Sequence, residues 1–204
     1  MASRRIRINR TLLPAITLAA LALALFHMQA NARTESAISE AHVSKERAYA
    51  LEPLIHDMVN EIRHERGLGL LFQDHDLNLI ALAHSKDMAK RNFFSHINPD
   101  GSSPDDRARL AGFTCEIRVG KTVYSMGENL GKVSIYEGYR YDPDSGEVME
   151  YDMRSDEAIA KSVVTAWMES PGHRENVLRE FWEAEGLGIH ITQDGMVLVT
   201  QLFC

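Results

Sequence analysis

Three side chains in this sequence have the types that bind a divalent metal, and none is expected inside a helix. His96 follows a predicted helix, Glu128 lies in the glycine-flanked stretch MGENLG, and His173 stands at a helix start. Two imidazoles and one carboxylate, with water as the fourth ligand, form a catalytic-type zinc site. The spacings of 32 and 45 residues leave open whether the three side chains converge.

The stretch SPGHRENVL around His173 also has the features of an ordinary helix start. Ser170 is a good N-cap residue and Pro171 suits the first helical position. His173 then has two interpretations: it lines a site, or it bonds the nearby backbone. The cap role also explains Ser170 without making it a nucleophile.

Familiar catalytic motifs are absent from the sequence. It has no G-x-S-x-G, no G-x-x-x-x-G-K-[ST], no G-x-G-x-x-G after a strand and no H-E-x-x-H. Glu61 and His64 form a single E-x-x-H, whereas di-iron bundles use two. We therefore assign no catalytic residue; the sequence leaves open whether the protein is an enzyme and favours a non-enzymatic role.

Apolar periodicity predicts four helices that cover a core. The first begins at Glu52 and ends before Gly67, the second covers 76–92, the third is capped by Ser103 and ends at Gly112, and the fourth is capped by Ser155. The expected inward residues are Leu54, Ile55, Met58, Val59, Ile62, Leu77, Ile80, Ala81, His84, Met88, Ile159, Val163, Ala166 and Trp167.

Strand and turn signals predict a small sheet. VGKTVYSMGENLG is typical of a strand that leads into a turn carrying Glu128, and turns at 142–146 and at Asp194-Gly195 each predict a hairpin. Helices outside a small, mainly antiparallel sheet make an α+β fold, a three-layer α-β-α sandwich.

The first 32 residues are typical of a secretory signal peptide. Four arginines precede an apolar run, and Ala30-Asn31-Ala32 predicts cleavage after Ala32. Residues 33–50 are a linker or a loosely held helix, and 51–204 form the domain. The apolar run is short for a membrane span, so no stable span is expected after cleavage. The protein is expected to be secreted or periplasmic.

Charge and cysteine content agree with export. Cleavage would remove four basic residues, so the formal charge falls from −7 to about −11, which argues against nucleic acid and anionic membranes as partners. Cys115 and Cys204 are expected to form a disulfide that holds the C-terminus, and two free thiols remain the alternative.

Four motifs in order resemble the CAP superfamily of cysteine-rich secretory, antigen 5 and pathogenesis-related 1 proteins. They are FFSHINPDGSSPDDR, MGENLG, VVTAWMESPGHRENVL, and GLGI with a terminal TQLF, and the resemblance runs from Leu54 to Phe203. It implies the sandwich described above. It also implies that the hairpin at about 135–153 is an insertion relative to shorter bacterial members.

The resemblance implies a cleft lined by two histidines and two acids. His96, Glu128 and His173 match three of the four positions, and Ser170 stands at the fourth, next to Glu169. The expected cleft is therefore His96, Glu128, His173, Glu169 and Ser170. Its expected metal ligands are His96, His173 and Glu128, and the cofactor is zinc or another divalent cation.

Three functions follow as hypotheses. The first is a non-enzymatic protein whose cleft binds a divalent metal or a small or lipidic ligand. The second is a metal-dependent hydrolase of the cell envelope, with Glu128 as general base. The third is an interaction module of the envelope that uses the tyrosine-rich hairpin.

Several other side chains have expected places. Asn176 is a structural hydrogen-bonding residue, Trp167 and Phe94 are core residues, and Arg107 pairs with Asp105 or Asp106. His84 is a hydrogen-bonded core or rim residue, and His190 faces away from the better-buried side of its strand.

Overall fold

A computed structural model describes the backbone of residues 13–204 and the side chains of residues 26–30 and 43–204. The basic start of the predicted signal peptide, residues 1–12, lies outside the described residues. The chain divides into two compact units, Met1–His42 and Val43–Cys204. Helix α1 (Leu13–Glu65) includes residues 33–50, for which linker and helix were both open. No described helix is both long enough and apolar enough to span a membrane.

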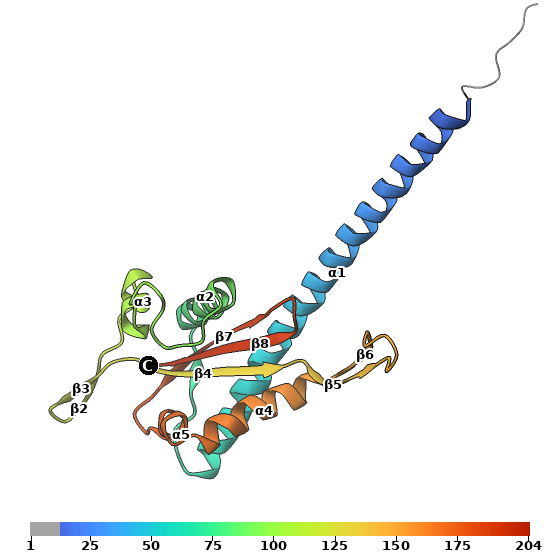
Figure 1. Cartoon of the computed structure of the whole chain (residues 1–204). Coiled ribbons are helices and arrows are strands. Elements are labelled where there is room, and N and C mark those ends of the chain that lie inside the picture. Colours follow the sequence, from blue (N-terminus) through green and yellow to red (C-terminus); the bar gives the residue numbers. More distant parts are fainter. Residues whose placement is uncertain (1–12) are drawn as a thin grey trace, which may run out of the picture. The chain divides into compact units, whose positions relative to one another are not determined.

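The second unit is built on a four-stranded sheet (Figure 1). Its strands, in spatial order, are β1 (Phe72–Gln73), β7 (Ala184–Ile191), β8 (Met196–Phe203) and β4 (Gly127–Ser134). Only the short β1 runs parallel to its neighbour, so the sheet is mainly antiparallel, as predicted. The β7–β8 hairpin turns at Asp194-Gly195, where Gly195 has φ +79°.

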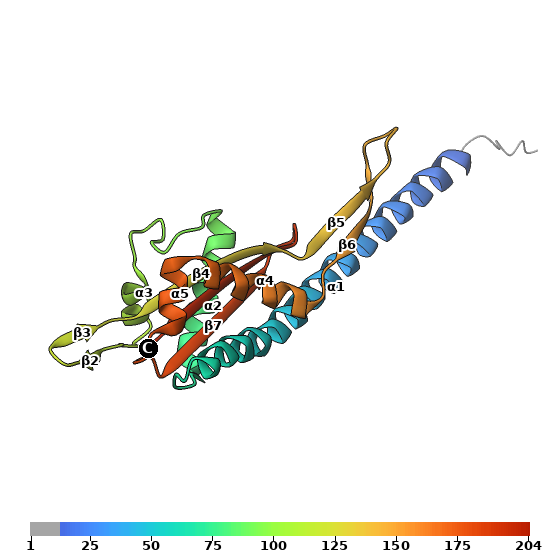
Figure 2. The same cartoon turned by 90° about the horizontal axis from the view of Figure 1, so that it is seen from below.

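Helices cover both faces of this sheet (Figures 1 and 2). On one face, α2 (His75–Arg91) and α3 (Pro104–Leu110) form a buried cluster with Ala184 and Leu202. On the other, α4 (Asp156–Glu169), α5 (Pro171–Leu178) and the α1 residues from Leu51 onward enclose the larger core. This is the predicted three-layer α-β-α sandwich.

Two glycines let α2 approach the sheet closely. A Cβ at Gly186 would lie 2.3 Å from the Leu77 backbone, and one at Gly188 would lie 1.9 Å from the Leu82 backbone nitrogen. The predicted inward face of α2 is confirmed, since Leu77, Ile80, Ala81, His84 and Met88 are all buried.

A buried arginine joins α1 to the end of α5. The Arg63 side chain is fully buried and donates hydrogen bonds to the carbonyl oxygens of Gly69, Val177, Arg179 and Trp182. Two of these carbonyls lie at the C-terminal end of α5, where helix carbonyls have no partner within the helix. Arg63 thus ties this end of α5, the helix that carries His173, to α1.

Two short hairpins lie outside the main sheet. One pairs β2 (Ile117–Val119) with β3 (Thr122–Tyr124) and was not predicted as a hairpin. The other pairs β5 (Tyr136–Tyr141) with β6 (Val148–Met153) and confirms the predicted hairpin around 142–146.

Three sequence-based expectations about the elements and the core are wrong. The stretch with Glu128 is strand β4 and not a turn. Ala166 is exposed, because the buried stripe of α4 follows Ile159, Ala160, Val163, Val164 and Trp167. Phe94 is 46% exposed, although Trp167 is in the core as expected.

Cys115 and Cys204 form a disulfide with a Cα–Cα separation of 5.7 Å. It joins the segment after α3 to the residue that follows β8. The same C-terminal residue exchanges backbone hydrogen bonds with Ala184 on β7. The expectation of a disulfide that holds the C-terminus is therefore confirmed.

Candidate functional site

Glu128 is the centre of the candidate site. It is the second residue of β4, and only 2% of its side chain is exposed. One carboxylate oxygen lies 2.8 Å from Nδ1 of His96, and the other pairs with the guanidinium of Arg107. The buried carboxylate is thus compensated by charged and polar donors on both oxygens, as a buried charge requires.

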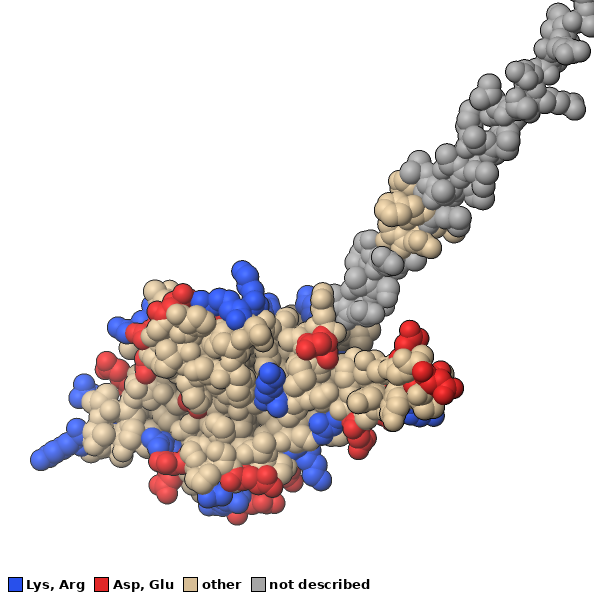
Figure 3. All heavy atoms as spheres, in the orientation of Figure 1, with Lys and Arg blue, Asp and Glu red and all other residues tan. Residues whose placement is uncertain are grey.

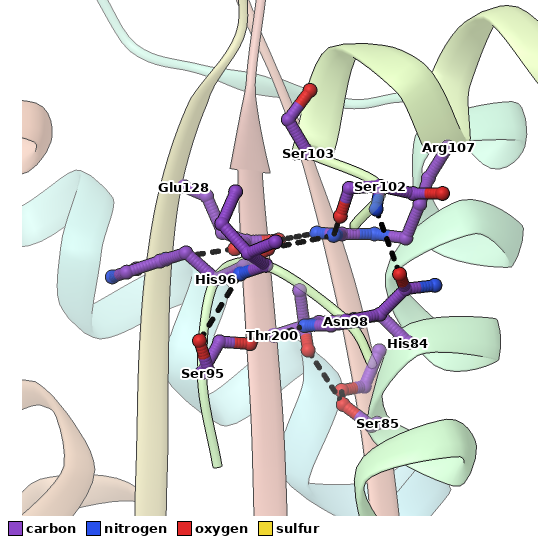
Figure 4. Close-up of polar contacts among 12 residues, drawn as sticks. His84, Ser85, Ser95, His96, Asn98, Ser102, Ser103, Arg107, Glu128 and Thr200 are labelled. Atoms are coloured by element: carbon purple, nitrogen blue, oxygen red, sulfur yellow. Dashed lines mark hydrogen bonds and ion pairs between the residues drawn. The ribbon is translucent and has the colours of Figure 1, made fainter. Parts of the chain in front are cut away.

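Arg107 is the site residue that the sequence analysis missed. It does not pair with Asp105 or Asp106; it reaches from α3 to Glu128 and also donates to the carbonyl oxygens of His96 and Ser102, at 2.8 and 3.2 Å (Figure 4). Arg107 therefore bonds the loop that carries His96 at two points, His96 itself and Ser102. A capping box was the available signal, because Asp106 already bonds Ser103.

His84 also holds the loop that carries His96. The Nε2 of His84 lies 3.0 Å from the carbonyl oxygen of Ser95, so this nitrogen carries the proton that is donated. His84 is buried, and burial lowers its pKa, which favours the neutral ring. The expectation of a hydrogen-bonded core histidine is confirmed.

His173 lies opposite His96. The ring centroids of the two histidines are 6.3 Å apart, and the rings are tilted by 59°. His173 is the third residue of α5, and its backbone carbonyl accepts a 3.2 Å hydrogen bond from Asn129. His96 and His173 are 77 positions apart in the sequence. In the structure they share one site with Glu128.

A chain of hydrogen-bonded amide side chains supports this site. Asn176 donates to the Glu128 carbonyl and to Asn129, at 3.1 and 3.0 Å, and Asn129 donates to Gln201 at 3.1 Å. Gln201 in turn donates to the fully buried carboxylate of Glu185 at 2.6 Å, and Glu185 bonds His56 on α1. The structural role expected for Asn176 is confirmed.

Glu169 and Ser170 lie beside the site without joining its hydrogen bonds. Glu169 is exposed at the end of α4 and forms no ion pair with another described residue. Ser170 occupies the N-cap position of α5, with Pro171 following as expected, but its side chain makes no capping hydrogen bond. The resemblance described above implies an acid at the position of Ser170. Glu169 does not replace that acid, because it forms no ion pair with either histidine.

The two imidazoles are the side chains of this site that could hold a metal ion. Among the described residues, no group of three or more His, Cys, Asp and Glu side chains is arranged to hold a metal. Both oxygens of Glu128 are engaged, so this carboxylate fits an orienting role, as carboxylates behind metal-binding histidines do. His96 and His173 would be the ligands, with Nε2 of His96 outside the bond to Glu128.

A separate cavity lies on another part of the domain. It has a volume of about 680 Å³ and is lined by residues of α1, of the segment that leads into β1 and of β1 itself, including His56, Asn60 and Phe72.

His190 lies on neither this cavity nor the histidine site. It is half-buried between the buried Ile189 and Ile191, so its expected orientation is confirmed.

The electrostatics of the site predict a measurable coupling between its two histidines. Burial and the neighbouring His96 lower the pKa of His173 below its ordinary value of 6.5. His96→Ala should therefore raise the pKa of His173, as read from the ring proton shifts in an NMR titration, while His190→Gln should leave it unchanged. An unchanged His173 pKa in His96→Ala would contradict the coupling.

The sign of the linked stability follows. Because the folded pKa of His173 is lowered, the unfolded chain takes up the proton first as the pH falls. The contribution of His173 to stability is present above pH 6.5 and is lost below it.

Comparison with known proteins assigns the chain to a family. The cysteine-rich secretory protein (CAP) family matches residues 56–203. The chain belongs to this family. The match includes the CAP-domain residues His96, Glu128 and His173 and both strands of the β7–β8 hairpin.

Three proteins that resemble this CAP chain come from bacteria. The uncharacterized protein YkwD of Bacillus subtilis is 28% identical over 139 residues, which cover 68% of this chain and 42% of YkwD. An extracellular SCP-domain protein of Bacillus anthracis has 26% identity and a TM-score of 0.54, over 78% of this chain and 42% of that chain. An outer surface protein of Borrelia burgdorferi shares the fold, with 18% identity, a TM-score of 0.54 and coverage of 76% and 91%. The chain spans less than half of YkwD.

Proposed function

We propose that this CAP protein is non-enzymatic and that its paired histidines bind a divalent metal ion, zinc above all, or a small or lipidic ligand. The observation that carries the proposal is the orientation of His96 by a buried carboxylate, with a second imidazole 6.3 Å away between ring centroids. Histidine nitrogens are common zinc ligands, and a carboxylate behind one of them increases its basicity.

The geometry supports binding over envelope hydrolysis. Glu128 would have to accept a proton to act as a general base, yet its two oxygens already bond His96 and Arg107. Ser170 has no hydrogen bond to a histidine among the described residues that would activate it as a nucleophile.

Export to the periplasm or beyond is part of the proposal. The arginine-rich apolar start, the A-x-A motif and the disulfide all support it. The Bacillus anthracis relative is described as extracellular, which agrees with the same location.

Zinc titration by calorimetry tests the metal-binding proposal. His96→Ala and His173→Ala should each weaken zinc binding at least about tenfold, because each removes one of two imidazole ligands. Glu128→Gln should weaken it about tenfold, because it disturbs the support of His96. His190→Ala is the matched control and should bind zinc as the unmodified protein does. Equal zinc binding by the His96→Ala/His173→Ala double variant would remove the metal-binding form of the proposal.

A further inference from the structure

The β5–β6 hairpin presents a surface that neither the core nor the histidine site uses. Its strands pair only with each other among the described residues, and it extends beyond the end of β4 (Figures 1 and 2). Its base is firmly held: Ile135 is buried and accepts from the Arg154 backbone at 2.8 Å, while its own amide donates to Gly195 at 2.9 Å. The hairpin is thus anchored at one end and exposed along the rest.

One face of the hairpin carries a cluster of tyrosines. Tyr139 pairs across the strands with Tyr151, and Tyr151 also stacks on Tyr136 with ring centroids 4.4 Å apart. The centroid of Tyr141 lies 6.5 Å from that of Tyr139. We call these four residues the tyrosine face; Tyr139, Tyr141 and Tyr151 are 62%, 61% and 49% exposed.

The rest of the hairpin is acidic. Residues 136–153 contain six carboxylates and one arginine, a formal charge of −5. That arginine, Arg140, is paired with Glu150 across the strands, on the face opposite Tyr139 and Tyr151. Acidic side chains gather at the hairpin in Figure 3. The negative charge is therefore not balanced within the hairpin.

We infer that the hairpin docks a basic, extended polypeptide segment. Lysine and arginine side chains would place their charges over the tyrosine rings, which attract cations, and near the carboxylates. Their aliphatic stems would cover the exposed Met149 and Val148, which are 73% and 43% exposed. The outer backbone edges of β5 and β6 pair with no described strand, so an extended segment can add to one of them.

Two other roles for this surface fit less well. Charges on an edge strand protect it from aggregation, but protection does not call for three exposed tyrosines beside them. Association with a second copy would bring two surfaces of charge −5 together, and like charges repel.

Fluorescence anisotropy with a labelled ten-residue peptide of alternating lysine and valine tests the inference on the full chain. The peptide should bind, and a glutamate–valine peptide of equal length should not. Tyr139→Ser/Tyr151→Ser should weaken binding about tenfold, because two exposed cation–π contacts are lost. Glu137→Gln/Glu147→Gln should also weaken it, whereas Glu180→Gln/Glu183→Gln removes equal charge elsewhere and should not.

The outcomes separate a built surface from general charge attraction. Equal weakening by both pairs of glutamate substitutions, with no effect of the tyrosine substitutions, would overturn the inference. So would binding of a β-1,4-linked N-acetylglucosamine hexamer without binding of the basic peptide, which would assign the tyrosines to a glycan.

A measurement on the unmodified protein guards against misfolded variants. Amide chemical-shift changes on addition of the basic peptide should concentrate in residues 136–153. Changes confined to other parts of the domain would also overturn the inference.

Discussion

Gly188→Ala lowers the stability of the domain by at least about 3 kcal/mol, because overpacking of this kind cannot be relieved by a side-chain rotation. The added Cβ would lie 1.9 Å from the backbone nitrogen of Leu82 and 2.1 Å from the backbone carbon of Ala81. Either α2 must move off the sheet or β7 must bend away from it. For a domain of this size the melting temperature should fall by about 6–12 °C in a calorimetric scan.

The matched control for Gly188 is another glycine of the same domain. A Cβ at Gly172 meets no atom within 4 Å, and Gly172 lies in α5, where alanine is the better helix former. Gly172→Ala should therefore leave the melting temperature unchanged or raise it slightly. Equal melting temperatures for Gly188→Ala and the unmodified protein would mean that α2 does not approach the sheet as described.

Removal of the disulfide has an expected effect of similar size. The bridge closes a loop with a sequence separation of 89 residues, for which the chain-entropy relation gives about 4.6 kcal/mol. Cys115→Ser/Cys204→Ser should therefore lower the free energy of unfolding in urea by about this amount. Cys115 is 5% exposed and packs in the cluster below α2 and α3, so its serine also loses some apolar contact.

A reductant provides the control for the cysteine variant. Dithiothreitol should lower the stability of the unmodified protein toward that of Cys115→Ser/Cys204→Ser and should leave the variant unchanged. The same urea midpoint for the oxidised protein and the variant would show that the bridge adds nothing to stability.

Much of the fold could be predicted because local chemistry and tertiary packing agree. The apolar period of α2 matches its buried face, Ser103 and Ser155 cap the helices that were expected to follow them, and Asp194-Gly195 turns a hairpin. Each of these signals involves residues close in sequence, so the backbone preference alone was informative.

Glu128 shows why the strand that carries it was mistaken for a turn. Glycines flank it, and glycine usually marks a turn. Here the glycines make room for packed side chains: a Cβ at Gly127 would lie 2.9 Å from Trp182, and one at Gly131 would lie 3.1 Å from Val163. Glycine in a strand can mark such a close approach, and only the three-dimensional packing distinguishes the two cases.

The site itself could be predicted in part. The residue types of His96, Glu128 and His173 were found, but their roles depend on partners far away in the sequence. Arg107 directly follows Asp105 and Asp106, one of which was expected to pair with it. Residues one or two apart on a helix do not face each other, however. Arg107 reaches Glu128, 21 positions away. Glu128, which was expected to be a metal ligand, is therefore engaged by Arg107 and supports His96 instead.

The hydrogen-bonded amides Asn176, Asn129 and Gln201, which lead to the carboxylate of Glu185, have a consequence for substitutions in this interior. Each member donates toward the next and the last bond ends on a buried carboxylate, so reversing one amide would set two donors or two acceptors against each other. Substitutions at Asn129, Asn176 and Gln201 are therefore interdependent, and their energetic effects will not add. A substitution at one of the three therefore calls for a compensating change at another, which links the support of the histidine pair across β4, α5 and β8.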